Sequence, residues 1–198
     1  MTTIGGHTEF QRETRALVRD AKTRAKILLG IVALMWLAEI ADTLLGHRLL
    51  LLGIVPRTLV GLRGILFAPL LHAGFWHLAA NTIPFLVLGW LVMLDRIRDF
   101  VVVTALVMLL GGFGVWLIGP AHSIHIGASG LIFGYLGFLL LRGFFQRSPA
   151  WIALAIFVGL AYGGLLWGVL PTLPGVSWQS HLCGLLAGAF AARRFQSA

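Results

Sequence analysis

Charged residues and cysteine are scarce in this sequence. Asp, Glu, Lys and Arg make up 11% of its 198 residues, whereas hydrophobic residues make up 59% and the mean hydropathy is +0.93. Because a soluble domain has about 25% charged residues, this chain has too few polar side chains to cover a water-exposed surface. The single cysteine, Cys183, cannot form an internal disulfide, which excludes a disulfide-stabilised scaffold. We therefore expect one all-α, polytopic membrane domain with lipid as part of its solvent.

Acidic residues are the rarer charged class. The chain has seven Asp and Glu residues against 15 Lys and Arg, which gives a formal net charge of +8. Such an excess can indicate a nucleic-acid partner. Here, however, the basic residues fall in short clusters between apolar blocks and lack the interleaved aromatic residues of a strand-binding platform. We expect no nucleic-acid partner, because membrane topology explains the charge better.

Six apolar blocks approach the length of about 20 helical residues that the hydrocarbon layer requires. They lie at residues 27–45, 77–94, 100–119, 128–141, 150–170 and 178–192. Residues 1–26 are polar and are expected to form a cytoplasmic tail, helical or loosely ordered, on the membrane surface, which leaves 27–196 as the membrane domain. Residues 46–76 are apolar but interrupted by Gly and Pro. They predict an interfacial or partly re-entrant loop with short helical pieces.

The basic residues favour one orientation in the membrane. Twelve of the fifteen Lys and Arg residues lie in segments 1–26, 95–99, 142–147 and 193–194, and the other three lie in 46–76. The positive-inside rule then assigns both termini to the cytoplasm and predicts six spans. We expect a prokaryotic plasma membrane, since no appended soluble domain or transit-like leader is recognisable.

Polar side chains stand at one depth in this topology. The second, fourth and sixth blocks all begin at the outer face, and His77 with Asn81, Ser129 and His181 lie near those ends. Polar groups at such depth are costly and are usually paired or functional. Ser129 could simply cap a helix, or it could be a nucleophile whose own N–H helps to hold an oxyanion. His77 and Asn81, spaced i and i+4, could bond neighbouring helices or donate to that oxyanion.

Two glycine seams could bring Ser129 and His181 together. Glycines four residues apart occur in the fourth and sixth blocks, as Gly130 with Gly134 and Gly184 with Gly188. Such pairs let transmembrane helices approach closely. His181 could then be the base for Ser129, although it could also be satisfied by a neighbouring backbone carbonyl. Among the acids only Glu39 and Asp42 approach this depth, so we expect a Ser–His dyad in which packing, not a carboxylate, positions His181.

Taken together, these residues resemble the rhomboid family of intramembrane serine proteases. The resemblance covers residues 27 to 195 and rests on His72-x4-His77-x3-Asn81, Gly127-x-Ser129-Gly130 and His181-x2-Gly184-x3-Gly188. It implies that Ser129 is the nucleophile, that His181 is the general base and acid, and that His77 and Asn81 stabilise the oxyanion. It also implies that His72 braces the first loop. The substrates would be transmembrane segments of other proteins, cut near the outer face without a metal or cofactor.

The chain departs from the family pattern at two positions. Phe133 stands where members often carry a tyrosine whose ring lies against the catalytic histidine, and we predict that the stacking persists. The first loop has Arg63 without the usual preceding tryptophan, which leaves a structural role for this arginine open.

Two other functions remain open from the sequence. A non-catalytic relative could bind transmembrane clients without cutting them. Alternatively, a metal-binding membrane protein or transporter could use outward-facing histidines, since imidazole suits zinc or copper. The candidate ligands are His72, His77, His122, His125 and His181. No carboxylate or cysteine cluster completes such a site, which weakens this alternative. The sequence leaves the oligomeric state and the natural substrates open.

Overall fold

The protein is a bundle of membrane-length helices. The computed structural model describes residues 4–172 and 175–195. Its long helical segments are α1 (Ile4–Leu44), α3 (Phe75–Val92), α4 (Ile97–Leu106) continued by η4 (Val107–Gly111) and α5 (Gly112–Ile118), α6 (Ser129–Gln146), α7 (Pro149–Tyr162) continued by η5 (Gly163–Val169), and α8 (Trp178–Arg194). Five of these segments are long and apolar enough to cross a membrane, and α8 is shorter, at 17 residues. The expected polytopic helical bundle is therefore confirmed, and each of the six predicted blocks corresponds to one helical segment.

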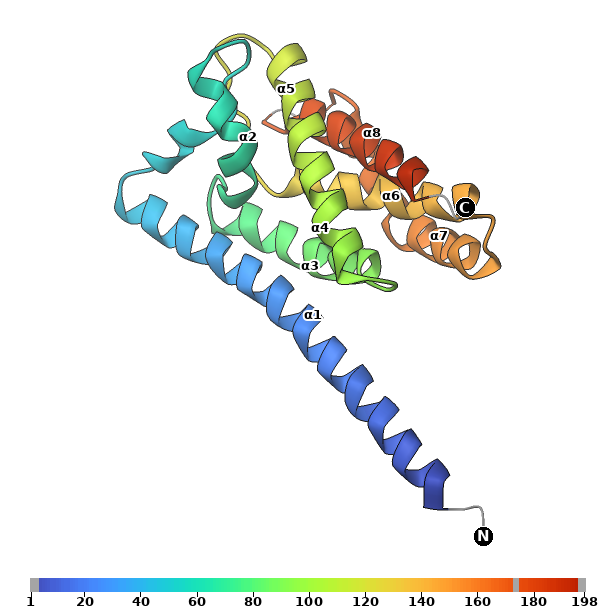
Figure 1. Ribbon diagram of the computed structural model, residues 1–198. Coiled ribbons are helices and arrows are strands. Elements are labelled where there is room, and N and C mark those ends of the chain that lie inside the picture. Colours follow the sequence, from blue (N-terminus) through green and yellow to red (C-terminus); the bar gives the residue numbers. More distant parts are fainter. Residues whose placement is uncertain (1–3, 173–174, 196–198) are drawn as a thin grey trace.

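The first helix is longer than its apolar block. α1 runs for 41 residues, and its amino-terminal half projects away from the other helices (Figure 1). The boundary expected at residue 26 lies inside this helix, because no Gly or Pro interrupts residues 11–29 and most of these residues are good helix formers. The change from polar to apolar sequence is thus not a change in secondary structure.

Helix α6 occupies the centre of the bundle. Every residue from Leu131 to Leu139 is buried, on all sides of the helix. A helix that is apolar all round belongs in a core, and α6 packs against α3, α7 and α8 (Figure 1). Its amino-terminal residue is Ser129, so the candidate nucleophile stands at the end of the most buried element.

The predicted glycine seams do face each other. A side-chain carbon added at Gly184 would collide with the carbonyl oxygen of Gly130, and one added at Gly188 would collide with the carbonyl oxygen of Gly134. The backbones of α6 and α8 are therefore in direct contact along two turns. Larger side chains at these positions would hold the two helices apart.

The first loop contains four short helical pieces, as predicted. They are η1 (Leu49–Leu52), η2 (Val60–Arg63), α2 (Gly64–Phe67) and η3 (Ala68–Leu70). Arg57 fastens this loop to the end of α5, since its guanidinium donates to the carbonyl oxygens of Leu117 at 3.0 Å and Gly119 at 2.7 Å. Arg63 donates to the carbonyl oxygen of Leu51 at 3.1 Å. It therefore ties two parts of the same loop together.

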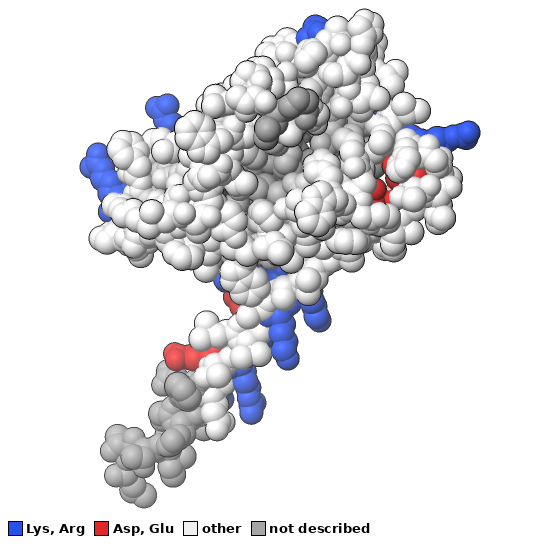
Figure 2. Space-filling view, turned by 180° about the vertical axis from the view of Figure 1, so that it is seen from behind, with Lys and Arg blue, Asp and Glu red and all other residues white. Residues whose placement is uncertain are grey.

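A buried arginine holds the opposite end of the bundle. Arg142 of α6 bonds Asp99 of α4 at 3.1 Å and Asp95 at 2.5 Å, and its guanidinium lies 3.9 Å from the ring centroid of Trp151 in α7. Glu39 and Asp42 of α1 are also buried. Figure 2 shows Lys and Arg on the projecting helix and at the margins, around a broad face without charged side chains. This distribution suits a lipid-exposed bundle.

Candidate active site

Ser129 is held at the start of α6 by contacts with the first loop. Gly127, with φ of +108°, makes the turn into the helix, and its N–H donates to the carbonyl oxygen of Ala68 at 2.8 Å. The N–H of Ala128 donates to Nε2 of His72 at 3.3 Å. The helix cap is Ala128, and Ser129 makes no capping bond. The capping alternative therefore does not describe Ser129, whose hydroxyl is left available.

His181 lies in the first turn of α8 with one ring nitrogen engaged. Its Nδ1 lies 2.8 Å from the carbonyl oxygen of Gly168 in η5. A carbonyl oxygen can only accept, so Nδ1 carries the proton and Nε2 is left as the basic nitrogen. The neighbouring-carbonyl alternative is thus realised, but it occupies only one of the two nitrogens.

Phe133 fixes the plane of the same imidazole. The rings of Phe133 and His181 are stacked, with centroids 4.1 Å apart and planes inclined by 5°. The predicted stacking is confirmed. A side-chain carbon added at Gly168 would lie 3.0 Å from Phe133 and 3.1 Å from His181 Nδ1, so the absence of a side chain at Gly168 is what permits the stacked pair to reach the η5 backbone.

His77 and Asn81 lie on one face of α3, as predicted, next to the serine. Nδ1 of His77 accepts from the N–H of Ala73 at 3.3 Å, which leaves the ring proton on Nε2. The Asn81 amide donates one N–H to the carbonyl oxygen of His77 at 2.8 Å and retains a second. A carbon added at Gly127 would lie 3.2 Å from His77 Nε2 and 3.8 Å from Ser129 Oγ. The Nε2–H of His77 therefore stands near the hydroxyl, and Asn81, with its second N–H, lines the same cavity.

His72 contacts both the His77 ring and the backbone that precedes Ser129. It is fully buried, and its ring meets that of His77 edge-on, with centroids 5.2 Å apart. Burial first, and the neighbouring His77 second, lower the pKa of His72 to about 4. The imidazole is therefore neutral near pH 7, and its Nε2 can accept the N–H of Ala128.

Ser129 and His181 line one cavity of about 580 Å³, together with His77, Asn81 and Phe133. The rest of its wall is mostly apolar, with two further polar residues, His125 and Ser177. Among the hydrogen bonds of the described residues, none joins Ser129 to His181. No Asp or Glu lies among the residues that line this cavity, and Asp42 instead bonds the N–H of Leu49 at 2.7 Å. The described geometry thus offers a serine and an imidazole without a carboxylate.

Several residues that shape the site were not predicted from the sequence. Gly168 and Ala73 act through backbone atoms, for which residue type gives no signal. His125, considered only as a metal ligand, bonds serines on both sides. Within residues 4–172 and 175–195, no group of three or more His, Cys, Asp or Glu side chains is arranged to hold a metal ion.

Comparison with known proteins is consistent with this geometry. The family model described as the Rhomboid domain matches residues 61–197. This chain belongs to the rhomboid family. The uncharacterised protein Rv1337 of Mycobacterium tuberculosis is 51% identical to this rhomboid over 173 residues, covering 83% of this chain and 72% of the relative. ML1171 of Mycobacterium leprae, also uncharacterised, is 49% identical over 193 residues, covering 93% of this chain and 74% of the relative.

A more distant relative carries a functional name. YdcA of Bacillus subtilis, designated a candidate rhomboid protease, is 37% identical to this rhomboid over 81 residues, or 40% of each chain. Family membership and the apolar helices make this protein a multi-pass membrane protein with a rhomboid fold. They also support a protease-like activity on membrane proteins.

Proposed function

We propose that this rhomboid is a serine-type intramembrane endopeptidase with a Ser129–His181 dyad. The observation that carries the proposal is the shared cavity, which Ser129 and His181 both line. The Ser129 hydroxyl makes no capping bond, and His181 bonds the Gly168 carbonyl through Nδ1, which leaves its Nε2 as the basic nitrogen. A serine needs a base to become a nucleophile at neutral pH, and imidazole is the usual one. The Gly168 carbonyl takes the orienting role that a carboxylate has in a triad.

The residues suggest a sequence of proton transfers. His181 Nε2 takes the Ser129 proton while Oγ attacks the carbonyl carbon of the scissile peptide. The resulting oxyanion would be held by the Ser129 N–H, which is free at the start of a helix, and by His77 Nε2–H and the second Asn81 N–H. His181 then gives its proton to the leaving amine. Water, deprotonated by His181, hydrolyses the acyl-enzyme, and Ser129 regains its proton as the carboxylate product leaves.

The setting of the cavity suggests the substrate and the orientation. Membership of the rhomboid family supports membrane proteins as substrates. A dyad that lies between membrane helices suits transmembrane segments that unwind near a bilayer surface. Twelve of fifteen Lys and Arg lie in segments 1–26, 95–99, 142–147 and 193–194. By the positive-inside rule this distribution supports cytoplasmic termini and a site near the outer face. The mycobacterial relatives support a prokaryotic plasma membrane.

Activity of the purified protein tests the proposal. We expect a fluorophosphonate probe to label the wild type and a transmembrane reporter substrate to be cut in liposomes. Ser129→Ala should abolish both, and His181→Asn should reduce both by at least about 10³-fold, since the dyad acts as a unit. Ser148→Ala, at the start of α7 and outside the cavity, should behave as wild type.

The same assay separates the alternatives. A wild-type protein that retains the reporter substrate without labelling or cutting it would instead be a client-binding rhomboid. Activity that is lost on chelation and unaffected by Ser129→Ala would favour a metal site.

A further inference from the structure

A second set of polar side chains joins the loops that precede Ser129 and His181. Nε2 of His125 lies 2.9 Å from Ser123 Oγ, and its Nδ1 lies 2.5 Å from Ser177 Oγ. The hydroxyls of Ser177 and Ser180 are 2.8 Å apart. His125 is only 5% exposed, so this network, which we name the loop clamp, is shielded from competing water. Its members are Ser123, His125, Ser177 and Ser180.

The clamp is fixed to the backbone near both members of the dyad. His125 precedes Ser129 by four residues, and its N–H and C=O both bond Ile54 of the first loop, at 2.9 and 3.0 Å. Ser177 caps α8, accepting the N–H of Ser180 at 3.3 Å, while its carbonyl oxygen accepts the N–H of His181 at 3.3 Å. A displacement of the His125–Ser177 bond is therefore passed to the first turn of each catalytic helix.

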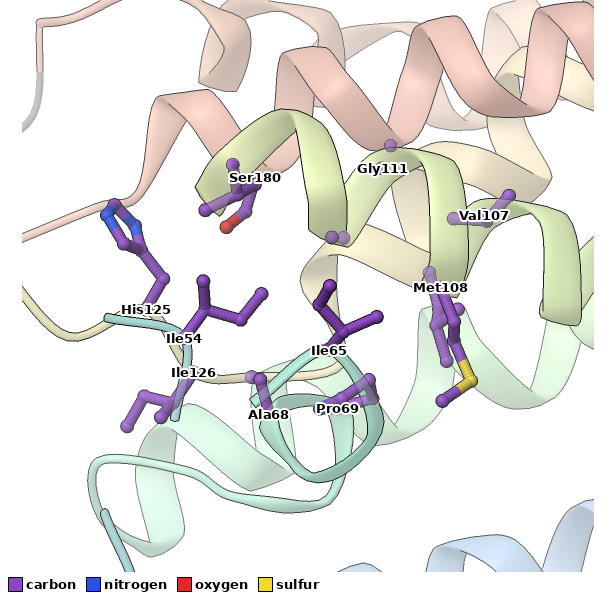
Figure 3. A pocket seen from close by; sticks show the side chains of 16 residues that line it. Ile54, Ile65, Ala68, Pro69, Val107, Met108, Gly111, His125, Ile126 and Ser180 are labelled. Carbon is purple, nitrogen blue, oxygen red and sulfur yellow. The ribbon is translucent and has the colours of Figure 1, made fainter. Parts of the chain in front are cut away.

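The position of His125 between two cavities strengthens this view. It lines the 580 Å³ cavity that contains Ser129 and His181, and also a smaller, mostly apolar cavity of about 40 Å³. Figure 3 shows His125 and Ser180 at one end of the smaller cavity, with Ile54 and Ile65 beside them. Burial lowers the pKa of His125 below its ordinary value. The neutral ring then has one donor and one acceptor nitrogen, one for each serine.

We propose that His125 is a positioning residue, whose bond to Ser177 holds the Ser129 loop and the first turn of α8 in the register that brings hydroxyl and imidazole together. The inference rests on the proposed function. The main seam between α6 and α8 fixes their distance, but Gly130 and Gly184 lack side chains that could resist sliding. A directional hydrogen bond between the two loops supplies that restraint. Misplacement of reacting groups by about 1 Å can cost about 10²-fold in rate.

The test compares variants on both sides of the clamp. His125→Phe keeps the ring volume and loses both bonds, and Ser177→Ala loses one end. Each should lower kcat for the reporter substrate and the rate of fluorophosphonate labelling by at least about tenfold, with KM within about twofold. The double variant should be no slower than the slower single variant, because the two changes break one bond. Ser177→Thr, which retains the hydroxyl, should restore most of the rate.

Two controls make the result specific. His122→Asn changes an exposed histidine in the same loop and should leave rates unchanged. Hydrogen exchange measured without substrate should rise in 125–130 and in 177–182 together when His125 or Ser177 is changed. If His125→Phe does not fold, His125→Gln and Ser177→Ala serve in its place.

Three outcomes would overturn the inference. These are folded variants that label within about twofold of wild type, a change confined to KM, and multiplicative losses in the double variant. If the wild type neither labels nor cuts, but exchange rises in both segments when His125 or Ser177 is changed, the protease is rejected and the clamp is retained as a structural link.

Discussion

At the scale of single residues, the chemistry depends on which nitrogen of each imidazole is already engaged. His181 uses Nδ1 for Gly168, and His77 uses Nδ1 for the N–H of Ala73. These two contacts leave a basic Nε2 on one ring and an Nε2–H donor on the other. Backbone groups thus leave opposite hydrogen-bonding capacities on two chemically identical side chains, which suits the base and the oxyanion donor of the proposed mechanism.

Stacking against Phe133 should keep the His181 imidazole in the orientation that catalysis needs. Phe133→Leu removes the stacking partner at 4.1 Å and lets the imidazole tilt about its Nδ1 bond. We expect kcat to fall about tenfold, which corresponds to about 1.4 kcal/mol of transition-state stabilisation. Phe133→Tyr keeps the ring and should retain activity. Steady-state cleavage of the reporter substrate measures this, and equal rates for Leu and Phe would contradict the role of stacking.

His72 should make the protein less stable in acid. Its pKa of about 4 in the folded state lies below the ordinary value of about 6.5. The unfolded chain therefore binds the proton first, and stability present above pH 6.5 is lost as the pH falls towards 4. The slope should reach at most about 1.4 kcal/mol per pH unit. Thermal midpoints in detergent between pH 8 and 4 measure it, and His72→Gln should flatten the dependence whereas His122→Asn should not.

At the scale of the helices, the contact between α6 and α8 decides stability. Gly188→Val would place a side chain against the carbonyl oxygen of Gly134, and neither backbone can move without opening the seam. We expect a loss of at least about 3 kcal/mol, beyond ordinary overpacking. Gly30→Ala is the matched control, because nothing lies within 4 Å of the added carbon and alanine favours a helix. Denaturant titration in detergent micelles compares the two, and similar midpoints would contradict the seam.

The hydropathy pattern predicted the helical segments but not the change of helix type within one of them. The apolar blocks predicted the helical segments because hydrocarbon demands continuous helix. The η4 segment, Val107–Gly111, is a π-helical turn, which is wider than an α-helix. This change of helix type was not predicted, because it leaves the apolar composition of the segment unchanged. At and just after this segment, Gly111 and Gly114 lie close against Cys183 of α8, a neighbour that the sequence of the helix itself does not specify.

At the scale of the whole molecule, the charges should set the orientation. Basic residues in the amino-terminal part of α1 and in the 95–99 and 142–147 segments would all lie on the cytoplasmic side. We expect a fluorescent protein fused after residue 198 to fluoresce, and alkaline phosphatase fused there to be inactive. The same reporters inserted after Gly175, which precedes α8, should give the opposite pattern. Active phosphatase at the carboxyl terminus would reverse the assigned topology and place Ser129 near the inner face.

The sequence by itself determined that the protein lies in a membrane, that it has about six membrane-length helical segments, and which residues are candidates for the site. Hydropathy and motif spacing are local properties of the chain, and they suffice for these conclusions. They also indicated that Gly184 and Gly188 could meet Gly130 and Gly134, because small residues allow such contact, but the structure was needed to show that they do.

Only the tertiary structure decided how the site is held. The carbonyl of Gly168, the N–H of Ala73 and the bond from His125 to Ser177 join positions that are far apart in the chain or act through backbone atoms. Backbone groups are the same at every position, so no residue pattern marks the ones that orient an imidazole. Their identity depends on where packing brings η5, the first loop and the cap of α8 together.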